Sequence, residues 1–466
     1  MSASFSLDPV LQSLSREELI AVARAQAESI AALGQEVERL ARLVEELQRR
    51  LDDEQGKPPR SAAPFRIPEA KRSSAPKKPG RPKGHPGSYR ARPEVIDEEV
   101  AVPLPHCPQC GGPVHGVQEV EQFIEELPPV RPRVTRLVTY EGECPQCGPV
   151  RSTHPLQVST ASGAAAVQLG PRALGAALEL RYTHHLTTRK TCAVLRNLLG
   201  LRLSPGGLTQ IAHRLADKLR GGYEALAAAA RQAAVQHADE TSWWVGGPGW
   251  WLWVFTDPSQ TLYRVRSSRG RDVIYETLGE RFPGVLVSDC LNIYDDVSPR
   301  QHKCYAHHLK AIAQAIEKHP RQGEGFLRDL RAVLQGAIGL KKARDQIDPA
   351  QYDALRRGAQ QTADRLLASP RLDAGEESVA NRLRKQRDHL FVFLDQEPVP
   401  ATNNQAERQL RPAVIARKVS CGNKTPRGAH TWEILASLAA TAHQARESLS
   451  LLVQRVSRLS LWPQPR

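Results

Sequence analysis

The sequence predicts a multidomain α+β protein. A chain of 466 residues has room for roughly three folded units of about 150 residues each. Apolar residues repeat every seven positions near the N-terminus, change to strand-like runs after residue 232, and return to helical spacing toward the C-terminus. These changes of period predict a helical N-terminal segment, a strand-rich centre and further helices.

The charge of the chain favours a polyanionic partner. There are 64 Lys and Arg residues against 50 Asp and Glu residues, a net charge of +14, which suits nucleic acid better than a membrane surface. No run of about 18 apolar residues occurs, and the start MSASFSLDPV does not resemble a signal peptide. We therefore expect a cytoplasmic protein without a membrane partner, whose cysteines serve metal binding better than disulfides.

A heptad repeat marks the N-terminal segment. β-Branched residues dominate its a positions and leucine its d positions, which favours a parallel two-stranded coiled coil and hence a homodimer or higher oligomer. The alternative is a single amphipathic helix packed on the protein's own core. The repeat consists of Ile30, Val37, Val44 and Leu51 at a, and of Leu33, Leu40 and Leu47 at d.

A basic, proline-rich linker follows. Residues 57–93 hold 11 Lys and Arg residues, nine prolines and a single acid, Glu69, so we expect extended chain. Its centre resembles an AT-hook, in which an arginine enters an A·T-rich minor groove; the alternative is a solvated linker that contacts phosphates without reading sequence. The basic residues of this centre are Lys77, Lys78, Arg81 and Lys83.

Four cysteines form two C-P-Q-C knuckles. Cys107 and Cys110 are separated by 33 residues from Cys144 and Cys147, and the intervening chain contains the β-prone residues 134–140. Two residues between thiolates let both sulfurs reach one ion, and four thiolates close a tetrahedral shell, so the pattern predicts a structural zinc ribbon. The alternative is four unrelated thiols.

Residues 165–220 read as helices. Gly200 fits a helix C-cap, and Ser204 followed by Pro205 fits the next helix start. Two helices joined by a tight turn suggest a helix-turn-helix with residues 204–218 as the recognition helix, and a plain packing layer is the alternative. The polar residues of that helix are Thr209, Gln210, His213 and Arg214.

The next segment is predicted to contain three strands, VQHADETSWWV, GWWLWVFTD and TLYRVRSS. A helix and a buried strand ending at Asp289 follow them. Acids on the first and fourth strands of this order are typical of a ribonuclease-H-like α/β domain. We expect the tryptophans of the first two strands to pack in the core rather than stack on bases. Helices fill the remainder of the chain.

Three acids stand out as catalytic candidates. Asp239, Asp289 and Glu407 are separated by 50 and 118 positions, and carboxylates are the ligands that Mg²⁺ prefers. Two such ions could activate a nucleophile and stabilise a leaving 3′-oxygen. The alternatives are a strand-end or salt-bridge role for the aspartates and pairing of Glu407 with Arg411; Asp295 and Asp296 are rival carboxylates.

Other polar residues near these acids have weaker signals. His307, which follows Cys304 in a C-x2-H fragment, is a candidate auxiliary residue that orients DNA or packs near the site. Basic residues after Glu407 outnumber acids and favour phosphate positioning. The ones we select are Arg408, Arg411, Arg417 and Lys418.

The chain resembles the transposases of the insertion sequence 66 (IS66) family over nearly its whole length. The matching features are the leucine-zipper segment, the linker P-G-R-P-K-G-H-P-G, the four cysteines, H-A-D-E-T at 237–241, C-Y-A-H at 304–307 and N-N-Q-A-E-R at 403–408. Where the family usually has Asp-Gly-Tyr, this chain has Asp289 followed by Cys290 and Leu291, with Tyr294 nearby.

The resemblance implies a DDE transposase of a mobile element. It implies that Asp239, Asp289 and Glu407 form the triad and that Mg²⁺ or Mn²⁺ are the catalytic ions. The implied partners are double-stranded transposon-end and target DNA and accessory proteins of the same element. The implied location is the bacterial nucleoid when the protein is bound to DNA. The alternatives are a ribonuclease-H-like nuclease or resolvase without strand transfer, and a non-catalytic zinc-ribbon DNA-binding regulator.

These inferences divide the chain into successive segments. They are a coiled coil (1–53), a basic linker (54–98), a zinc ribbon (99–158), a helix-turn-helix-like region (159–232), a ribonuclease-H-like catalytic core (233–310 and 401–445), a helical insertion (311–400) and a C-terminal tail (446–466).

Overall fold

The computed structural model describes residues 15–17, 20, 85–87, 89–159, 161–318 and 325–459. The chain divides into two compact units, Met1–Glu119 and Val120–Arg466. The heptad residues from Ile30 to Leu51 and the basic residues from Lys77 to Lys83 lie outside the described residues. The coiled coil and the AT-hook therefore stay predictions.

The first unit contains one cysteine knuckle. The Gly111 N–H donates to the Cys107 carbonyl (2.8 Å) and the Cys107 N–H to the Gly112 carbonyl (2.9 Å), which closes a tight turn. Gly111 has a φ of +72°, a backbone conformation that favours glycine because it has no Cβ. The glycine after the knuckle is thus a requirement of the turn.

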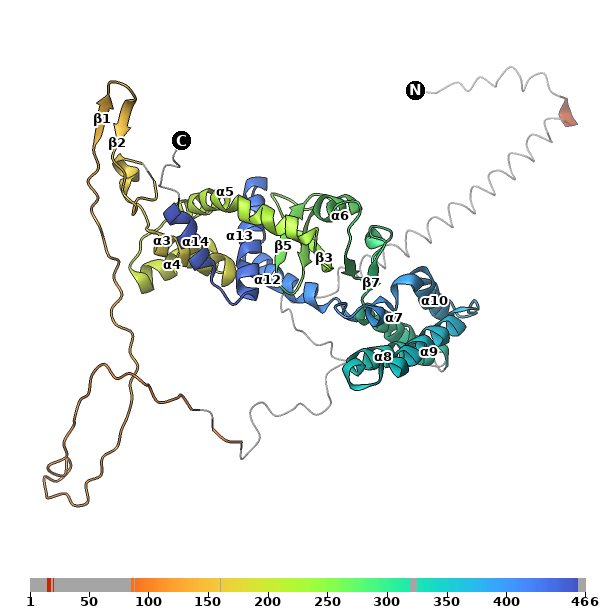
Figure 1. The fold of residues 1–466 in the computed structure, drawn as a ribbon, viewed down its shortest axis with the longest axis horizontal. Coiled ribbons are helices and arrows are strands. Elements are labelled where there is room, and N and C mark those ends of the chain that lie inside the picture. Colours follow the sequence, from red (N-terminus) through yellow and green to blue (C-terminus); the bar gives the residue numbers. More distant parts are fainter. Residues whose placement is uncertain are drawn as a thin grey trace. The chain divides into compact units, whose positions relative to one another are not determined.

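The second unit starts with the other knuckle. Strands β1 (Glu141–Cys144) and β2 (Gly148–Arg151) pair antiparallel, and the knuckle forms the turn between them (Figure 1). The β-prone residues 134–140 form no strand. Strand propensity alone was misleading there, because most of these side chains are exposed. Strand pairing is stabilised mainly by the packing of side chains, which exposed residues do not supply.

Within residues 171–230, three α-helices lead into the sheet. Helix α3 (Pro171–Leu178) continues into a π-helical turn (Glu179–Thr183) and is followed by α4 (Thr188–Leu199) and α5 (Pro205–Ala230). Gly200 ends α4 with a φ of +64°, and the Ser204 hydroxyl accepts the Gly207 N–H at the start of α5 (3.0 Å). Both predicted caps are confirmed.

The centre of the unit is a mixed sheet. Within residues 235–303 the order is β5-β4-β3-β6-β7, in which β3 to β5 are antiparallel and β6 and β7 run parallel to β3. The predicted order of three strands, a helix and a fourth strand is confirmed. The bounds are β3 Val235–Trp243, β4 Trp250–Thr256, β5 Thr261–Arg266, α6 Arg271–Leu278, β6 Val285–Ser288 and β7 Gln301–Lys303.

Helices cover both faces of this sheet. Helices α12 (Asn404–Ser420) and α13 (Pro426–Gln444) contact the face that carries Tyr263, whose hydroxyl donates to the Gln409 carbonyl (2.5 Å) and whose N–H donates to Ser437 (2.8 Å). On the opposite face Arg264 pairs with Glu276 of α6 (3.1 Å). The sheet is therefore a buried central layer.

The tryptophans mainly serve this core, as predicted. Trp253 is fully buried, and Trp243 packs against Trp432 of α13 with ring centroids 4.6 Å apart. Trp250 and Trp251 pack on the core while partly buried. Trp244 is the exposed member of the group, with 39% of its surface accessible.

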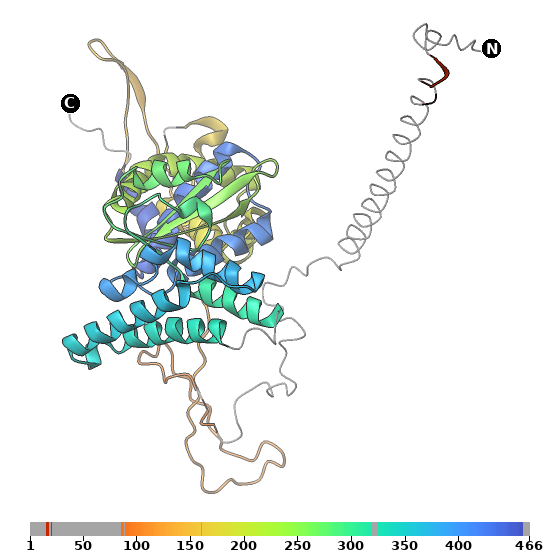
Figure 2. The ribbon, with the colours of Figure 1, turned by 90° about the vertical axis from the view of Figure 1, so that its right-hand side faces the viewer.

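Residues 311–400, predicted to be helical, form a layer with its own core (Figure 2). Leu330, Leu334 and Phe393 are fully buried in it, and the core continues onto the sheet through Val285 and Val287. The helices are α7 Tyr305–Lys318, α8 Phe326–Lys342, α9 Pro349–Leu367, α10 Ala374–Lys385 and α11 Val392–Asp395.

The C-terminal segment differs from the expected tail. Residues 446–466 include helix α14 (Leu449–Leu459), which packs on α3. Gly175 of α3 lies so close to Ser450 that a Cβ there would meet its hydroxyl oxygen at 2.4 Å. Leu449 and Val453 are buried in the main core. Among the described residues, no helix is both long and apolar enough to cross a membrane.

Candidate active site

Two of the predicted acids lie on neighbouring parallel strands. β3 and β6 pair with Val235 opposite Val285 and His237 opposite Val287, an offset of 50 positions. Asp239 and Asp289 have the same offset and lie two residues beyond the last of these pairs. The register therefore brings them side by side where β6 ends, although they are 50 residues apart in the chain.

Alternation along the strands gives both aspartates the same face. Successive side chains of a strand point to opposite faces, so Asp239 shares a face with Val235 and His237, and Asp289 continues the face of Val285 and Val287. These valines pack in the core of the helical layer. Both carboxylates thus belong to the face covered by that layer and by the start of α12.

Asn403 fastens the start of α12 to this face. Its side-chain amide donates to the Ala238 carbonyl (2.8 Å), and its Oδ1 accepts from Nδ1 of His237 (2.9 Å). Its backbone N–H donates to the Cys304 sulfur (3.1 Å). Asn403 is 1% exposed, so these bonds tie three elements together in a buried position where unmade bonds are expensive.

Glu407 follows one turn later. Its N–H donates to the Asn403 carbonyl (3.2 Å), so the anchored asparagine also fixes the first turn of the helix that carries the glutamate. Glu407 is exposed, and Asp239 and Asp289 are partly buried. The glutamate therefore approaches the aspartates from the solvent side.

The electrostatics of Asp239 show that the three acids are neighbours. Burial, followed by the negative charges of Glu240, Asp289 and Glu407, raises the pKa of Asp239 to about 8, while a hydrogen bond from the Glu240 N–H opposes the rise. Across the described residues, no three His, Cys, Asp or Glu side chains converge tightly enough to hold a metal ion. Asp289 and Glu407 therefore contribute negative charge near Asp239 without converging with it on one point.

Comparison with known proteins identifies the family. Residues 166–431, more than half of the chain, match the family described as "Transposase IS66 family". The chain belongs to the IS66 family of transposases. The comparison with curated proteins gives no match. In this transposase the matched region runs from just before α3 into α13 and contains Asp239, Asp289 and Glu407.

Glu240 has a separate role in the transposase. It points to the opposite face of β3, where Arg269 binds its Oε1 (2.9 Å) and the Tyr294 hydroxyl donates to its Oε2 (2.5 Å). Arg269 also stacks over Trp251, 4.3 Å from the ring centroid. The Glu240 carboxylate thus has two side-chain partners within the fold, whereas the Asp239 carboxylate accepts a backbone N–H.

The rival acid Asp295 is held by lysines. It lies 3.4 Å from Nζ of the fully buried Lys303 and 2.8 Å from Nζ of Lys385. Burial tends to raise the pKa of Asp295, but the two lysines outweigh it and lower the pKa. Asp296 is exposed with a φ of +61°. This ion-pair network with two lysines accounts for the position of Asp295.

The histidines after Cys304 lie in different environments. His308 is buried, with Nε2 3.5 Å from the Cys290 sulfur, and burial lowers its pKa to about 3. His307 is partly buried, and its Nδ1 has no hydrogen-bond partner within the described residues. The proposed auxiliary role of His307 stays a prediction.

The basic residues of α12 divide into two groups. Arg408, Arg411 and Lys418 are exposed. Arg417 instead binds β3, donating to Oγ1 of Thr241 (3.1 Å) and Oγ of Ser242 (2.9 Å). Its guanidinium therefore joins α12 to the sheet, a contact that charge counting along the sequence could not reveal.

The expected recognition helix is only partly exposed. Thr209, Gln210 and Arg214 face solvent, but His213 is 8% exposed and lies 2.6 Å from Oγ1 of Thr431 in α13. We therefore correct the assignment of His213 to the polar surface of that helix: it belongs to the contact between α5 and α13.

Each cysteine knuckle favours thiolates. Backbone N–H groups of Cys110 and Gln109 lower the pKa of Cys107, and those of Gln146 and Cys147 lower the pKa of Cys144. Such donors stabilise sulfur in the charged form that binds zinc. The knuckles belong to different units, and a single zinc shared by all four cysteines stays a prediction of the sequence.

Sequence reasoning assigned no role to His237 or Asn403. Both occur in the motifs that carry the family resemblance, but their mutual hydrogen bond spans 166 positions. Only the pairing of β3 with the start of α12 makes that bond visible.

Proposed function

We propose that this transposase cleaves and joins DNA strands with Asp239, Asp289 and Glu407 as a DDE triad. The observation that carries the proposal is the shared offset of 50 in the β3–β6 register together with the effect of the Asp289 and Glu407 charges on the pKa of Asp239. Carboxylates from two adjacent strands and one helix can surround a reacting phosphate from three directions.

The strand order supports a ribonuclease-H-like catalytic core. Three antiparallel strands, a crossover helix and two strands parallel to the first give the order β5-β4-β3-β6-β7. This arrangement places the first and fourth strands side by side at the centre of the sheet, which is where the two aspartates lie. Fold likeness alone does not define a reaction, so the chemistry of the acids carries the proposal.

Divalent cations are the counter-charge that we propose for these acids, which do not converge tightly on one point in the structure. Asp239 lies partly buried beside two other acids, and its pKa of about 8 shows that the charged form lacks a sufficient counter-charge. A hard cation bound by oxygen ligands would supply that charge. Two bound Mg²⁺ or Mn²⁺ ions would activate the attacking water or 3′-hydroxyl and stabilise the leaving 3′-oxygen.

The protein's own residues position this cluster. Asn403 holds the first turn of α12 against β3 and thereby holds Glu407 near Asp239. Arg269 and Tyr294 hydrogen-bond to the Glu240 carboxylate on the opposite face of β3 and so keep this fourth carboxylate out of the cluster. The exposed Arg408, Arg411 and Lys418 on α12 are positioned to contact DNA phosphates.

A cleavage and joining assay tests the triad. Labelled duplex carrying the DNA that borders the coding region on both sides is incubated with the protein and Mg²⁺, and products are separated on a denaturing gel. We expect Glu407→Gln to reduce nicking and joining at least about 100-fold, equivalent to about 2.7 kcal/mol. Glu224→Gln, an exposed site on α5, is the matched control and should retain activity.

The outcomes separate the candidate functions. Nicked and joined products that disappear in Glu407→Gln support a DDE transposase. Cleavage without joining would instead support a nuclease or resolvase. DNA binding with neither product in the wild-type protein would favour a regulator, and equal activity in Glu407→Gln and wild type would refute the triad.

A further inference from the structure

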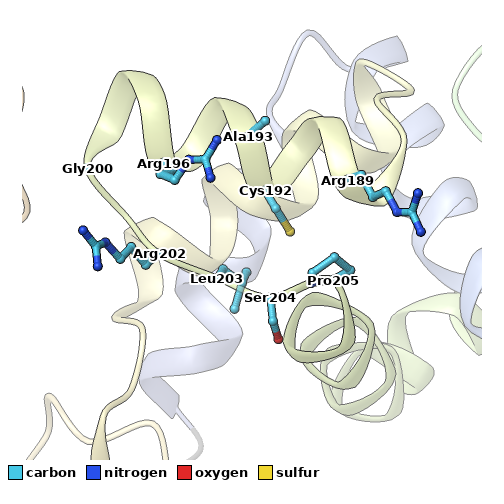
Figure 3. Close-up of a pocket in the computed structure, with 9 residues that line it drawn as sticks. All are labelled: Arg189, Cys192, Ala193, Arg196, Gly200, Arg202, Leu203, Ser204 and Pro205. Atoms are coloured by element: carbon cyan, nitrogen blue, oxygen red, sulfur yellow. The ribbon is translucent and has the colours of Figure 1, made fainter.

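A second candidate site lies between α4 and α5, outside the carboxylate cluster. The two helices and their turn border an open cavity of about 800 Å³. Arg189 and Arg196 extend from α4, and Arg202 extends from the turn (Figure 3). Among the residues that the structure describes, none of those lining the cavity is acidic.

The charge imbalance extends along the surrounding chain. Residues 180–216 contain no Asp or Glu. The same segment holds six basic residues, namely Arg181, Arg189, Lys190, Arg196, Arg202 and Arg214. A segment with one sign of charge creates a local potential that attracts an anion.

The three cavity arginines are available for a ligand. All are exposed, and within the described part of the chain no carboxylate pairs with any of them. Arg196 bonds to the side-chain oxygen of Asn197 (3.1 Å). By contrast, Arg266 and Arg269 bind carboxylates and stabilise the sheet region.

The start of α5 adds to the positive potential. This helix has 26 residues, and no acid lies in its first turn, so its positive end is not neutralised. A Cβ at Gly206 would meet open space, which leaves the backbone accessible to a ligand that approaches from solvent.

The spacing of the arginines fits a polymer better than a single small anion. In Figure 3 the guanidinium groups lie apart around the cavity rather than meeting at one point. Arg196 follows Arg189 by seven positions, about 10 Å along a helix. One strand of duplex DNA carries a charge about every 3.4 Å along the axis, so this separation spans about three phosphates.

We propose that the cavity between α4 and α5 binds the phosphodiester backbone of duplex DNA through Arg189, Arg196 and Arg202. The proposal rests on the proposed function, because it supplies that enzyme with a DNA contact formed by other elements than the catalytic acids. Thr209, Gln210 and Arg214 lie on the exposed side of α5. They would lie near DNA whose phosphate backbone is bound by the three arginines.

The test is the salt dependence of DNA binding. Full-length protein carrying Asp289→Asn, which silences the proposed chemistry, is titrated onto fluorescent duplex DNA between about 50 and 200 mM salt in Ca²⁺. Each phosphate contact contributes about 0.9 to the slope of log affinity against log salt. We expect Arg202→Gln and Arg196→Gln each to lower that slope by about 0.9 and to weaken binding several-fold on every sequence.

Two further variants separate charge from folding. Arg202→Lys keeps the charge and should keep most of the slope. Arg220 lies on α5, one of the two helices that border the cavity, but pairs with Asp217 (3.1 Å), so Arg220→Gln should leave the slope unchanged. Equal slopes for Arg202→Gln and wild type, an equal loss in Arg220→Gln, or no binding of duplex DNA by the parent protein would overturn the proposal. Loss of cleavage in Glu407→Gln is read separately and does not bear on this result.

Discussion

The raised pKa of Asp239 predicts that the proposed catalytic cluster destabilises the fold when no cation is bound. Replacing Asp239 with Asn keeps the shape of the side chain and removes its charge. Burial and the neighbouring acids raise the pKa of Asp239 from its ordinary value of 3.8 to about 8 in the folded protein. The folded state therefore holds this proton up to about pH 8, whereas the unfolded chain releases it near pH 4. Between these values, the contribution of Asp239 to stability falls as the pH rises.

The magnitude follows from the same two values. At pH 7, about three units above the pKa of Asp239 in the unfolded chain, loss of the proton favours unfolding by about 4 kcal/mol, at about 1.36 kcal/mol per unit. Water reaches part of this side chain, so we expect Asp239→Asn to recover about half, about 2 kcal/mol. For a unit of roughly 350 residues the unfolding entropy is about 0.7 kcal/mol/K, and the gain corresponds to about 3 °C in the melting temperature.

Thermal melting in EDTA from pH 5 to pH 9 measures this effect. We expect the gain of Asp239→Asn over wild type to be small at pH 5 and to grow toward pH 8. Added Mg²⁺ should stabilise wild type more than the variant, because the cation supplies the missing counter-charge. Asp217→Asn, at an exposed site paired with Arg220, is the control and should change stability by less than about 0.5 kcal/mol. A variant that melts at or below wild type at every pH would refute the reasoning.

Three further substitutions test other parts of the structure. Asn403→Ala should reduce strand cleavage at least about 10-fold and lower stability by about 1–3 kcal/mol, because the bonds to β3 are lost; unchanged cleavage on the gel would contradict a positioning role. Arg417→Ala should lower the melting temperature but leave the salt slope of DNA binding unchanged, since its guanidinium binds β3; a lower slope would place it on DNA. Cys144→Ser should abolish bound zinc in metal analysis of the purified protein, and full retention of zinc would disprove the four-cysteine site.

Local patterns in the sequence determined much of the fold. The order of strands around Asp239 and Asp289, the caps at Gly200 and Ser204, and the helical nature of residues 311–400 all depend on side chains close together in the chain. Alternation, capping and helical spacing are short-range properties, so they can be read directly. The three candidate acids were selected in the same way, from their positions at strand ends and in motifs.

Other features depended on contacts between distant segments. β7 has three residues, too few to show a period, and it exists because β6 offers a parallel edge. Helix α14 is a docked helix rather than a tail because α3 has a glycine where Ser450 approaches. His213 is buried because α13 lies against it.

The site itself shows the division most clearly. The sequence determined which carboxylates were available, because residue type and local period are written in it. The tertiary structure decided which carboxylates lie near one another. The β3–β6 register aligned Asp239 with Asp289, Asn403 brought the helix of Glu407 to them, and Arg269 and Tyr294 engaged Glu240 elsewhere. Pairing across 50 to 168 positions is set by the packing of whole elements, and no local pattern specifies it.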